Sequence, residues 1–230
     1  MFGILIAMPA EARCFSPSFR SIGKIYTLSP KTLVAVSGMG ALASQSARDL
    51  MKQGAGCLIS CGTAVGLAPH IKPGTLCIPQ QILSDGQDAY DCDPDLRKQV
   101  LMSINGSLNL EEGDLVHTAA VLKTSNEKQA LYQTSAAIAS DMESLFVAQE
   151  AKHHQIPFLA LRVVIDDAHF TMPEQLTQSI SPHGEVILRK LLFNLCKQPS
   201  LLSPLLTLAI NFNKTRKVLK CVSQMTIFLD

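Results

Sequence analysis

The chain has almost no net charge and no long apolar run. Twenty Lys and Arg residues stand against nineteen Asp and Glu residues, which leaves +1 over 230 residues. Nucleic-acid-binding domains usually carry a basic excess, so the overall charge gives no sign of such a partner. No uninterrupted apolar stretch approaches the roughly 18–20 residues that span a bilayer, and we expect a soluble protein.

The sequence also lacks the residue spacings of a metal site. Cys57 and Cys61 are four residues apart, but no further Cys or His pair lies near them to complete a zinc site, and the histidines are no better spaced. We therefore expect no metal and no cofactor. The seven cysteines are an odd number and fit reduced thiols in a cytoplasmic protein. Met1–Met8 is apolar without a charged segment before it, which predicts a buried strand rather than a secretory signal.

Short apolar runs alternate with helix-like stretches along the chain. The predicted strands are continuous in apolar residues, as expected where helices cover both faces of a sheet. They are Phe2–Met8, Thr32–Ser37, Cys57–Gly62, Thr75–Pro79, Leu115–Leu122 and Pro157–Ile165. The predicted helices are Ala41–Gln53, Pro94–Ile104, Ser125–Tyr132, Glu143–His154 and Pro182–Leu195. This alternation predicts one α/β domain over residues 1–195, with an acidic loop at Asp85–Asp95.

Residues 196–230 form a different kind of segment. Residues 186–230 hold seven Lys and Arg and one acid, a net of +6, whereas residues 1–185 carry a net of −5. The apolar positions follow three- and four-residue steps, which predicts a basic amphipathic helix. They are Leu201, Leu205, Leu208, Phe212, Leu219 and Val222. Two interpretations stay open: a terminal helix packed on the domain, or a helix that binds a membrane surface through residues 199–222.

Two glycine motifs follow predicted strands and exclude two enzyme classes. The segment from Gly38 to Ala43 fits the dinucleotide-binding fingerprint, but the next strand contains no acid to bind a ribose, which argues against a Rossmann site. The segment from Gly62 to Gly66 has Ala64 where a nucleophile elbow needs Ser, so the chain is no α/β-hydrolase. The hydroxyl of Thr63 could bind a sugar or cap local backbone groups.

Three acids lie in unusually apolar surroundings. Glu11 follows the first predicted strand, Glu143 begins a predicted helix, and Asp166 ends the most apolar strand. Each acid alone could complement a helix dipole or cap a turn. Because open α/β sheets build their sites at the carboxyl ends of strands, three such acids together indicate an active site.

The motifs around these acids resemble the nucleoside phosphorylase/nucleosidase superfamily, which includes the methylthioadenosine/S-adenosylhomocysteine nucleosidases. The resemblance covers Met1 to about Leu195. Its motifs are Ala7-Met8-x-x-Glu11, Ser37-Gly-Met-Gly, Cys61-Gly-Thr-Ala-Val-Gly-Leu, Asp141-Met-Glu-Ser and Arg162-Val-Val-Ile-Asp. The Asp85-Gly86 loop and the proline-interrupted tail from Lys197 are similar to the hopanoid-associated phosphorylases, which are thought to release adenine from adenosylhopane.

The resemblance implies a three-layer α/β/α fold with a mixed central sheet, a C-terminal helical extension and an enzyme that cleaves purine nucleosides. Glu143 would bind the ribose hydroxyls with Met142 packed against the sugar, Asp166 would protonate N7 of the departing purine, and Glu11 would activate the attacking water. The remaining implied contacts are Val121 and Leu122 beside the base, and Thr63, Ser37 and Gly38 around the nucleophile. Where the family has Ser or Thr before the catalytic Asp, this chain has Ile165.

The reaction and the partners stay open at this level. Phosphorolysis would need a cationic pocket for inorganic phosphate as co-substrate, and near the candidate pocket the sequence offers Arg13, Arg48 and Arg162. Because Glu11 would repel phosphate, we favour hydrolysis. Methylthioadenosine or S-adenosylhomocysteine could be the substrate instead of adenosylhopane, and a non-catalytic nucleoside-binding protein is a further alternative. We expect a cytoplasmic homodimer or higher homo-oligomer, with peripheral contact at the inner membrane surface as an option, and no nucleic-acid partner.

Overall fold

The computed structural model describes residues 1–84, 88–104, 108–177, 179 and 187–229. The strands are β1 (Phe2–Ile6), β2 (Ile25–Ser29), β3 (Thr32–Val36), β4 (Cys57–Gly66), β5 (Leu76–Cys77), β6 (Gln81–Leu83), β7 (Ala89–Asp91), β8 (Leu110–Glu111), β9 (Leu115–His117), β10 (Ala139–Asp141) and β11 (Phe158–Asp166). The helices are α1 (Pro9–Ala12), α2 (Leu42–Lys52), α3 (Pro94–Ser103), α4 (Ser125–Ser135), α5 (Ser144–His153), α6 (Glu174–Thr177), α7 (Leu188–Lys197), α8 (Leu202–Ser223) and α9 (Thr226–Leu229), with a 3-10 turn at Pro199–Leu201.

The strands form one mixed sheet around β4. The sheet runs in the order β2-β3-β1-β4-β10-β9-β6-β7, and β11 pairs with β4 in a branch that continues through β5 to β8. β1 and β11 both run parallel to β4, whereas β10 runs antiparallel to its last residues. β4 is ten residues long: β11 pairs with it from Leu58 to Val65, β1 pairs with its first five residues, and β10 pairs with its last two. This branching brings the carboxyl ends of β1, β4, β10 and β11 together.

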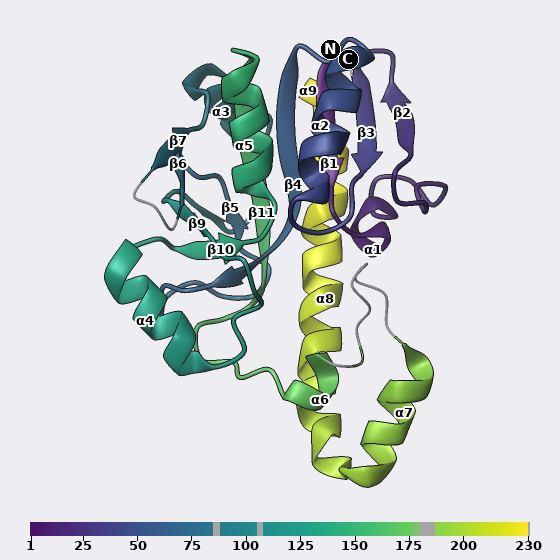
Figure 1. The fold of residues 1–230 in the computed structure, drawn as a ribbon, viewed down its shortest axis with the longest axis vertical. Coiled ribbons are helices and arrows are strands. Elements are labelled where there is room, and N and C mark those ends of the chain that lie inside the picture. The colour runs from purple at the N-terminus through teal and green to yellow at the C-terminus, as the bar shows by residue number, and fades with distance from the viewer. Residues whose placement is uncertain (85–87, 105–107, 178, 180–186, 230) are drawn as a thin grey trace.

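Helices cover both faces of the sheet, as predicted for a three-layer α/β/α fold. α2 and α5 pack against each other over one face, and α8 and α9 lie over the other face (Figure 1). The strands between them are buried on both sides, with Ile4, Ile59 and Leu161 fully inaccessible to solvent. The continuous apolar runs of β1, β3, β4 and β11 follow from this double cover.

The C-terminal helix belongs to the core of this fold along half of its length. Val218, Leu219 and Val222 are buried in the main apolar cluster, and the hydroxyl of Thr215 donates to the carbonyl of Val164 in β11. Residues 202–210 instead continue past the sheet, beside α7 (Figure 1). The packed-helix interpretation therefore describes the second half of α8. Within the described residues, no helix is long and apolar enough to cross a membrane.

Several boundaries differ from the sequence-based expectations. The strand predicted at Leu115–Leu122 ends at His117, and Thr118, Val121 and Leu122 of the following loop line a cavity. The loop predicted at Asp85–Asp95 contains β7, which pairs with β6. The sequence of β7 has no apolar pattern, because this three-residue strand is held by backbone hydrogen bonds and its side chains are largely exposed. The helix predicted at Pro182–Leu195 is described from Leu188 onward as α7, and residues 182–186 lie outside the described residues.

Candidate active site

The predicted acids lie around a cavity of about 120 Å³ at the carboxyl ends of the central strands. Such an edge is where α/β sheets bind their ligands. Six of the nine predicted site residues line this cavity: Glu11, Thr63, Val121, Leu122, Met142 and Glu143. Ser37 and Gly38 lie just before Met39, and Asp166 just after Ile165, and in both cases the neighbouring residue lines the cavity. The structure therefore brings the nucleophile side and the sugar side of the predicted site together.

Glu11 is held by the short helix that follows β1. Pro9 opens this helix, and Glu11 at its third position accepts a hydrogen bond from the backbone N–H of Met8 (3.2 Å). The other carboxylate oxygen accepts from both the N–H and the hydroxyl of Thr63, each at 2.8 Å. Burial raises the pKa of Glu11, while the hydrogen bonds from Thr63 and the charge of Arg162 oppose the rise. A carboxylate held in this way can take a proton from a water molecule.

Glu143 faces Glu11 across the cavity from the first residue before α5. Its Oε1 accepts a hydrogen bond from the N–H of Gly40 at 3.2 Å, and its Oε2 lies 3.9 Å from Nη2 of Arg162. Gly40 has φ +64°, a left-handed conformation that favours glycine, and this turn aims its N–H at the acid. Burial raises the pKa of Glu143 to about 7, against the opposing charge of Arg162. Glu143 therefore changes its protonation state around neutral pH, and its carboxylate form, which accepts hydrogen bonds from hydroxyl groups, predominates above pH 7.

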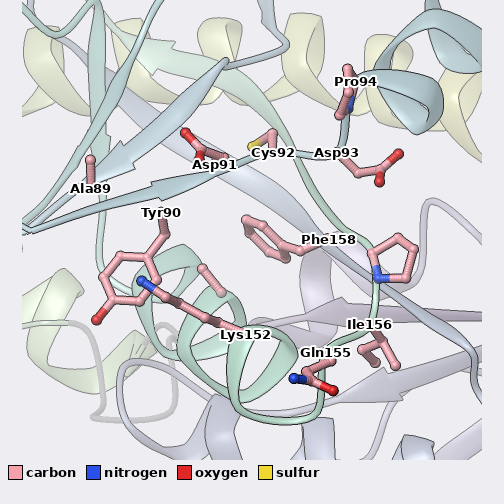
Figure 2. A pocket seen from close by; sticks show the side chains of 12 residues that line it. Ala89, Tyr90, Asp91, Cys92, Asp93, Pro94, Lys152, Gln155, Ile156 and Phe158 are labelled. Carbon is pink, nitrogen blue, oxygen red and sulfur yellow. The ribbon is translucent and has the colours of Figure 1, made fainter.

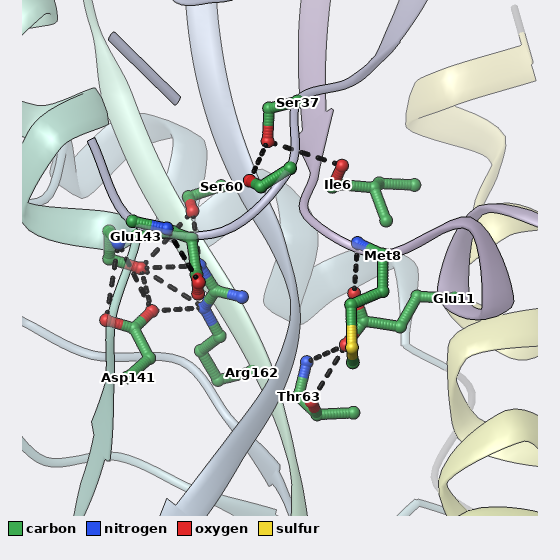
Figure 3. A network of polar contacts seen from close by, with 12 residues as sticks. Ile6, Met8, Glu11, Ser37, Ser60, Thr63, Asp141, Glu143 and Arg162 are labelled. Atoms are coloured by element: carbon green, nitrogen blue, oxygen red, sulfur yellow. Dashed lines mark hydrogen bonds and ion pairs between the residues drawn. The ribbon is translucent and has the colours of Figure 1, made fainter. Parts of the chain in front are cut away.

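Arg162 is a buried cation beside Asp141 and Glu143 (Figure 3). Its Nε lies 2.5 Å from a carboxylate oxygen of Asp141, and its Nη2 donates to the hydroxyl of Ser60 at 2.5 Å. Burial by itself lowers the pKa of the Arg162 guanidinium, but the surrounding acids, Asp141 first, raise it above its ordinary value. Since the strongest contact of Arg162 is its pair with Asp141, the guanidinium is not free for a phosphate ion.

The other two arginines that could have bound phosphate also lie elsewhere. Arg48 pairs with Glu150 where α2 meets α5, and Arg13 is exposed. Three acids, Glu11, Asp141 and Glu143, face the single guanidinium of Arg162. Among the described residues, the cavity therefore has an excess of negative charge, which disfavours an anionic co-substrate.

Asp166 is fixed at the end of β11 by a contact that the sequence did not reveal. Its Oδ2 lies 2.6 Å from Nζ of Lys128, whose side chain is fully buried. Burial raises the pKa of Asp166, and the ammonium of Lys128 opposes this rise. A lysine in the middle of a polar helix predicts a solvated side chain, so nothing in the sequence distinguished Lys128. Asp141 lies within one of the motifs found in the sequence, but its pairing with Arg162 depends on β10 and β11, which both pair with β4 and not with each other.

A larger cleft of about 440 Å³ lies at the opposite, amino-terminal end of β11 (Figure 2). Its acids have structural partners: Asp93 caps α3 by accepting from the N–H of Leu96, and Asp91 accepts from the side chain of Gln81. Lys152 lies over the ring of Tyr90, 4.8 Å from its centre. The described residues that line this cleft form no arrangement of buried acids comparable to that of the smaller cavity.

Solved structures share the fold over most of the chain. An S-adenosylhomocysteine nucleosidase from Streptococcus pyogenes, in complex with 5-methylthiotubericidin, aligns with a TM-score of 0.64 and 18% identity over 73% of this chain and 84% of its own. A 5'-methylthioadenosine/S-adenosylhomocysteine nucleosidase and a futalosine hydrolase, both from Helicobacter pylori, each align with a TM-score of 0.64 and 19% identity over 73% of this chain and 85% of their own. No curated protein sequence matches the chain significantly.

The family model described as the phosphorylase superfamily matches residues 2–191. That range contains every acid of the cavity and ends within α7. The fold agrees with it, since nucleosidases of known structure have the same arrangement of sheet and helices. The chain belongs to the phosphorylase superfamily of nucleoside-cleaving enzymes.

Proposed function

We propose that this protein cleaves the N-glycosidic bond of an adenine nucleoside by hydrolysis. The observation that carries the proposal is the pair of buried carboxyl groups that face one cavity, Glu11 held by Thr63 and Glu143 held by Gly40. One acid is in position to act on water and the other on a sugar. The structural neighbours whose names include nucleosidase or hydrolase support the same reaction class.

In the proposed reaction, water attacks C1′ of the ribose while the bond from C1′ to the purine breaks. Glu11 accepts the proton that the water loses, and the bonding electron pair leaves with the base. Glu143 accepts hydrogen bonds from the ribose hydroxyls and stabilises the positive charge that develops on the sugar, as carboxylates do in glycoside hydrolysis. Asp166 donates a proton to N7 of the departing purine, a general-acid step that typically contributes about 10²–10⁴ in rate.

The balance of charge favours water over phosphate as the nucleophile. The buried guanidinium of Arg162 is paired with Asp141, and both Glu11 and Glu143 would repel an anion. Adenine release should therefore be equally fast in phosphate-free buffer and in buffer with added phosphate. The measurement is chromatography of the released base. A strict requirement for phosphate would overturn hydrolysis while leaving the nucleoside-cleaving class intact.

Glu11→Gln provides the matched test of water activation. The amide keeps the shape of the side chain but cannot accept the proton, so hydrolysis should fall by about 10²–10⁴. Binding of a nucleoside should change little, because Glu143 and the apolar residues of the cavity remain. Unaltered turnover in this variant would contradict the assigned role of Glu11.

For the substrate, we propose an adenine nucleoside with a lipid on its 5′ side, of the adenosylhopane type. The support is an exposed apolar surface on the projecting end of α7 and α8. Phe193, Leu202, Leu206 and Ile210 are each more than half exposed, at 58%, 52%, 53% and 57%. We call this surface the apolar tip. Such a surface suits contact with a bilayer from which a lipid-linked substrate is drawn.

Methylthioadenosine or S-adenosylhomocysteine is the second candidate substrate, favoured by the neighbours that act on these compounds by name. Parallel assays with adenosylhopane, methylthioadenosine and adenosine separate the two candidates. A preference for methylthioadenosine would refute the lipid-linked substrate. Binding of all three without release of adenine would indicate a non-catalytic nucleoside-binding protein.

We further propose a cytoplasmic homo-oligomer. The described cysteines are free thiols, which suits a reducing compartment. Leu42 and Val121 expose 50% and 42% of their surface although Val121 lines the cavity, and a second copy could cover such residues. Sedimentation measurements test the oligomer, and a monomer at micromolar concentration would contradict it.

A further inference from the structure

Lys128 is an unusual residue to find inside this fold. It belongs to α4, and it is the one residue of that helix that is buried. Its ammonium group has three hydrogen atoms to donate, and three oxygens receive them: Oδ2 of Asp166 at 2.6 Å and the carbonyls of Asp167 and Phe170, both at 2.8 Å. A buried lysine is costly unless its charge is compensated. Here every donor has a partner, so the side chain is held in one position.

The lysine also joins the two segments that border the base side of the cavity. The loop before α4 contains Val121 and Leu122, which line the cavity. Asp166 ends β11, and Asp167 and Phe170 belong to the segment that follows it. A backbone hydrogen bond from Met172 to the carbonyl of Lys123, 2.7 Å long, connects the same two segments. Movement of Lys128 would therefore displace the acid and the apolar contacts together.

The strand places no other hydrogen-bonding side chain beside the acid. β11 is irregular at its end, because the pairing with β4 shifts between Val164 and Asp166, and Ile165 at that irregularity faces the cavity. Ile165 has no group that could support the carboxylate. Among contacts between described residues, Oδ2 of Asp166 is bound by Lys128 and Oδ1 has no hydrogen-bond partner.

We propose that Lys128 is the positioning residue of the leaving-group acid: it fixes Oδ2 of Asp166 and leaves Oδ1 to meet N7 of the departing purine. This inference rests on the proposed function. The positive charge has a second consequence that a neutral hydroxyl would not have. It favours the ionised form of Asp166, so Asp166 loses its proton at a lower pH than it would without Lys128. The other charged groups near Asp166 are Asp167 and Lys72, whose Nζ lies 3.9 Å from Oδ2 of Asp167.

The test is the pH profile of kcat for adenine release by Lys128→Met, compared with the unchanged protein. Loss of positioning should lower the plateau of kcat by about ten- to a hundredfold. Loss of the charge should move the high-pH fall of kcat upward by about 1–3 pH units, the usual effect of one nearby opposite charge. Lys72→Met is the matched control, because Lys72 is largely exposed and contacts Asp167 rather than Asp166, and its profile should not move.

A lower melting temperature with an unmoved pH profile would overturn the inference, since a purely structural lysine has no effect on the titration of the acid. If Lys128→Met does not fold, Lys128→Gln keeps an uncharged amide with two N–H donors and should show the same upward shift. Asp166→Asn separates this inference from the proposed function. Full activity of Asp166→Asn would refute Asp166 as the acid, whereas an inactive Asp166→Asn with unmoved profiles in both Lys128 variants would refute only the role of Lys128.

Discussion

At the scale of single residues, the ionisation of Glu143 should control nucleoside binding. Burial raises its pKa to about 7, and only the carboxylate can accept hydrogen bonds from both ribose hydroxyls. Below pH 7 the carboxyl group becomes protonated, so the Kd of a non-hydrolysable nucleoside analogue should rise about tenfold per pH unit. Calorimetry between pH 5 and 8 measures this dependence. In Glu143→Gln the dependence should disappear, and its persistence would assign the titration to another group.

The raised pKa of Glu143 also makes the stability of the folded protein depend on pH. The direction of this dependence is opposite to that of an acid whose pKa is lowered by an ion pair. The pKa of Glu143 is raised from 4.5 in the unfolded chain to about 7 in the folded protein, so the folded state binds more protons between these values. The contribution of Glu143 to folding therefore becomes less favourable as pH rises through this window. A nucleoside that donates hydrogen bonds to the carboxylate would reverse part of this loss.

At the scale of secondary-structure elements, the site depends on the close approach of β4 to α1 and to β11. A methyl group on Gly62 would lie 2.6 Å from Nη1 of Arg162 and 3.1 Å from a carboxylate oxygen of Glu11. Both groups are held by other contacts and have little room to move. Gly62→Ala should therefore cost about 1–3 kcal/mol of stability, lower the melting temperature by roughly 2–4 °C per kcal/mol and reduce turnover.

Gly56 provides the control for this change. It lies immediately before β4, and a methyl group there would meet no atom within 4 Å. Gly56→Ala should melt and turn over as the unchanged protein does. If Gly62→Ala were equally silent, Arg162 would have to be free to move, which would contradict the fixed arrangement of Arg162 and its acids.

At the scale of the whole molecule, charge and apolar surface are unevenly distributed. The ends of α7 and α8 that hold the apolar tip lie at one end of the molecule (Figure 1). Lys190 and Lys197 of α7 and Lys214 and Lys217 of α8 are exposed. If this end meets an anionic bilayer, vesicles with phosphatidylglycerol should bind the protein and vesicles of phosphatidylcholine alone should bind it weakly. The double variant Leu206→Gln/Ile210→Gln should bind at least tenfold more weakly, because each buried aliphatic side chain contributes about 1.5–3 kcal/mol.

Deletion of residues 199–230 would not test this surface. Val218, Leu219, Val222 and Phe228 are part of the core, so the shortened chain would lose stability for reasons unrelated to lipid. The control for the tip variant is Met102→Gln. Met102 is 78% exposed on α3, and α3 lies away from the ends of α7 and α8 that hold the tip (Figure 1). Equal vesicle binding by the tip variant and the unchanged protein would refute membrane contact.

The sequence by itself determined the superfamily, the three-layer class and most of the cavity. Continuous apolar runs predict strands buried on both faces, and acids at the ends of such strands indicate a site. Both patterns involve residues that are close in sequence, so they are visible without the structure. Glu11, Glu143 and Thr63 could be found in this way. The prediction missed β2, β6, β7, β8 and β10. The last four are two or three residues long, and such short strands leave too few side chains to form a pattern.

Only the tertiary structure decided which charges meet. Lys128 and Asp166 are 38 residues apart, and Arg162 and Asp141 lie on strands that do not pair with each other. A lysine in a polar helix has the same sequence pattern whether water or a buried carboxylate surrounds its ammonium group. Burial and distance set the energy of an ion pair, and both arise only when the chain has folded. The division of α8 into a packed half and a projecting half was decided in the same way, because its apolar stripe continues through both halves.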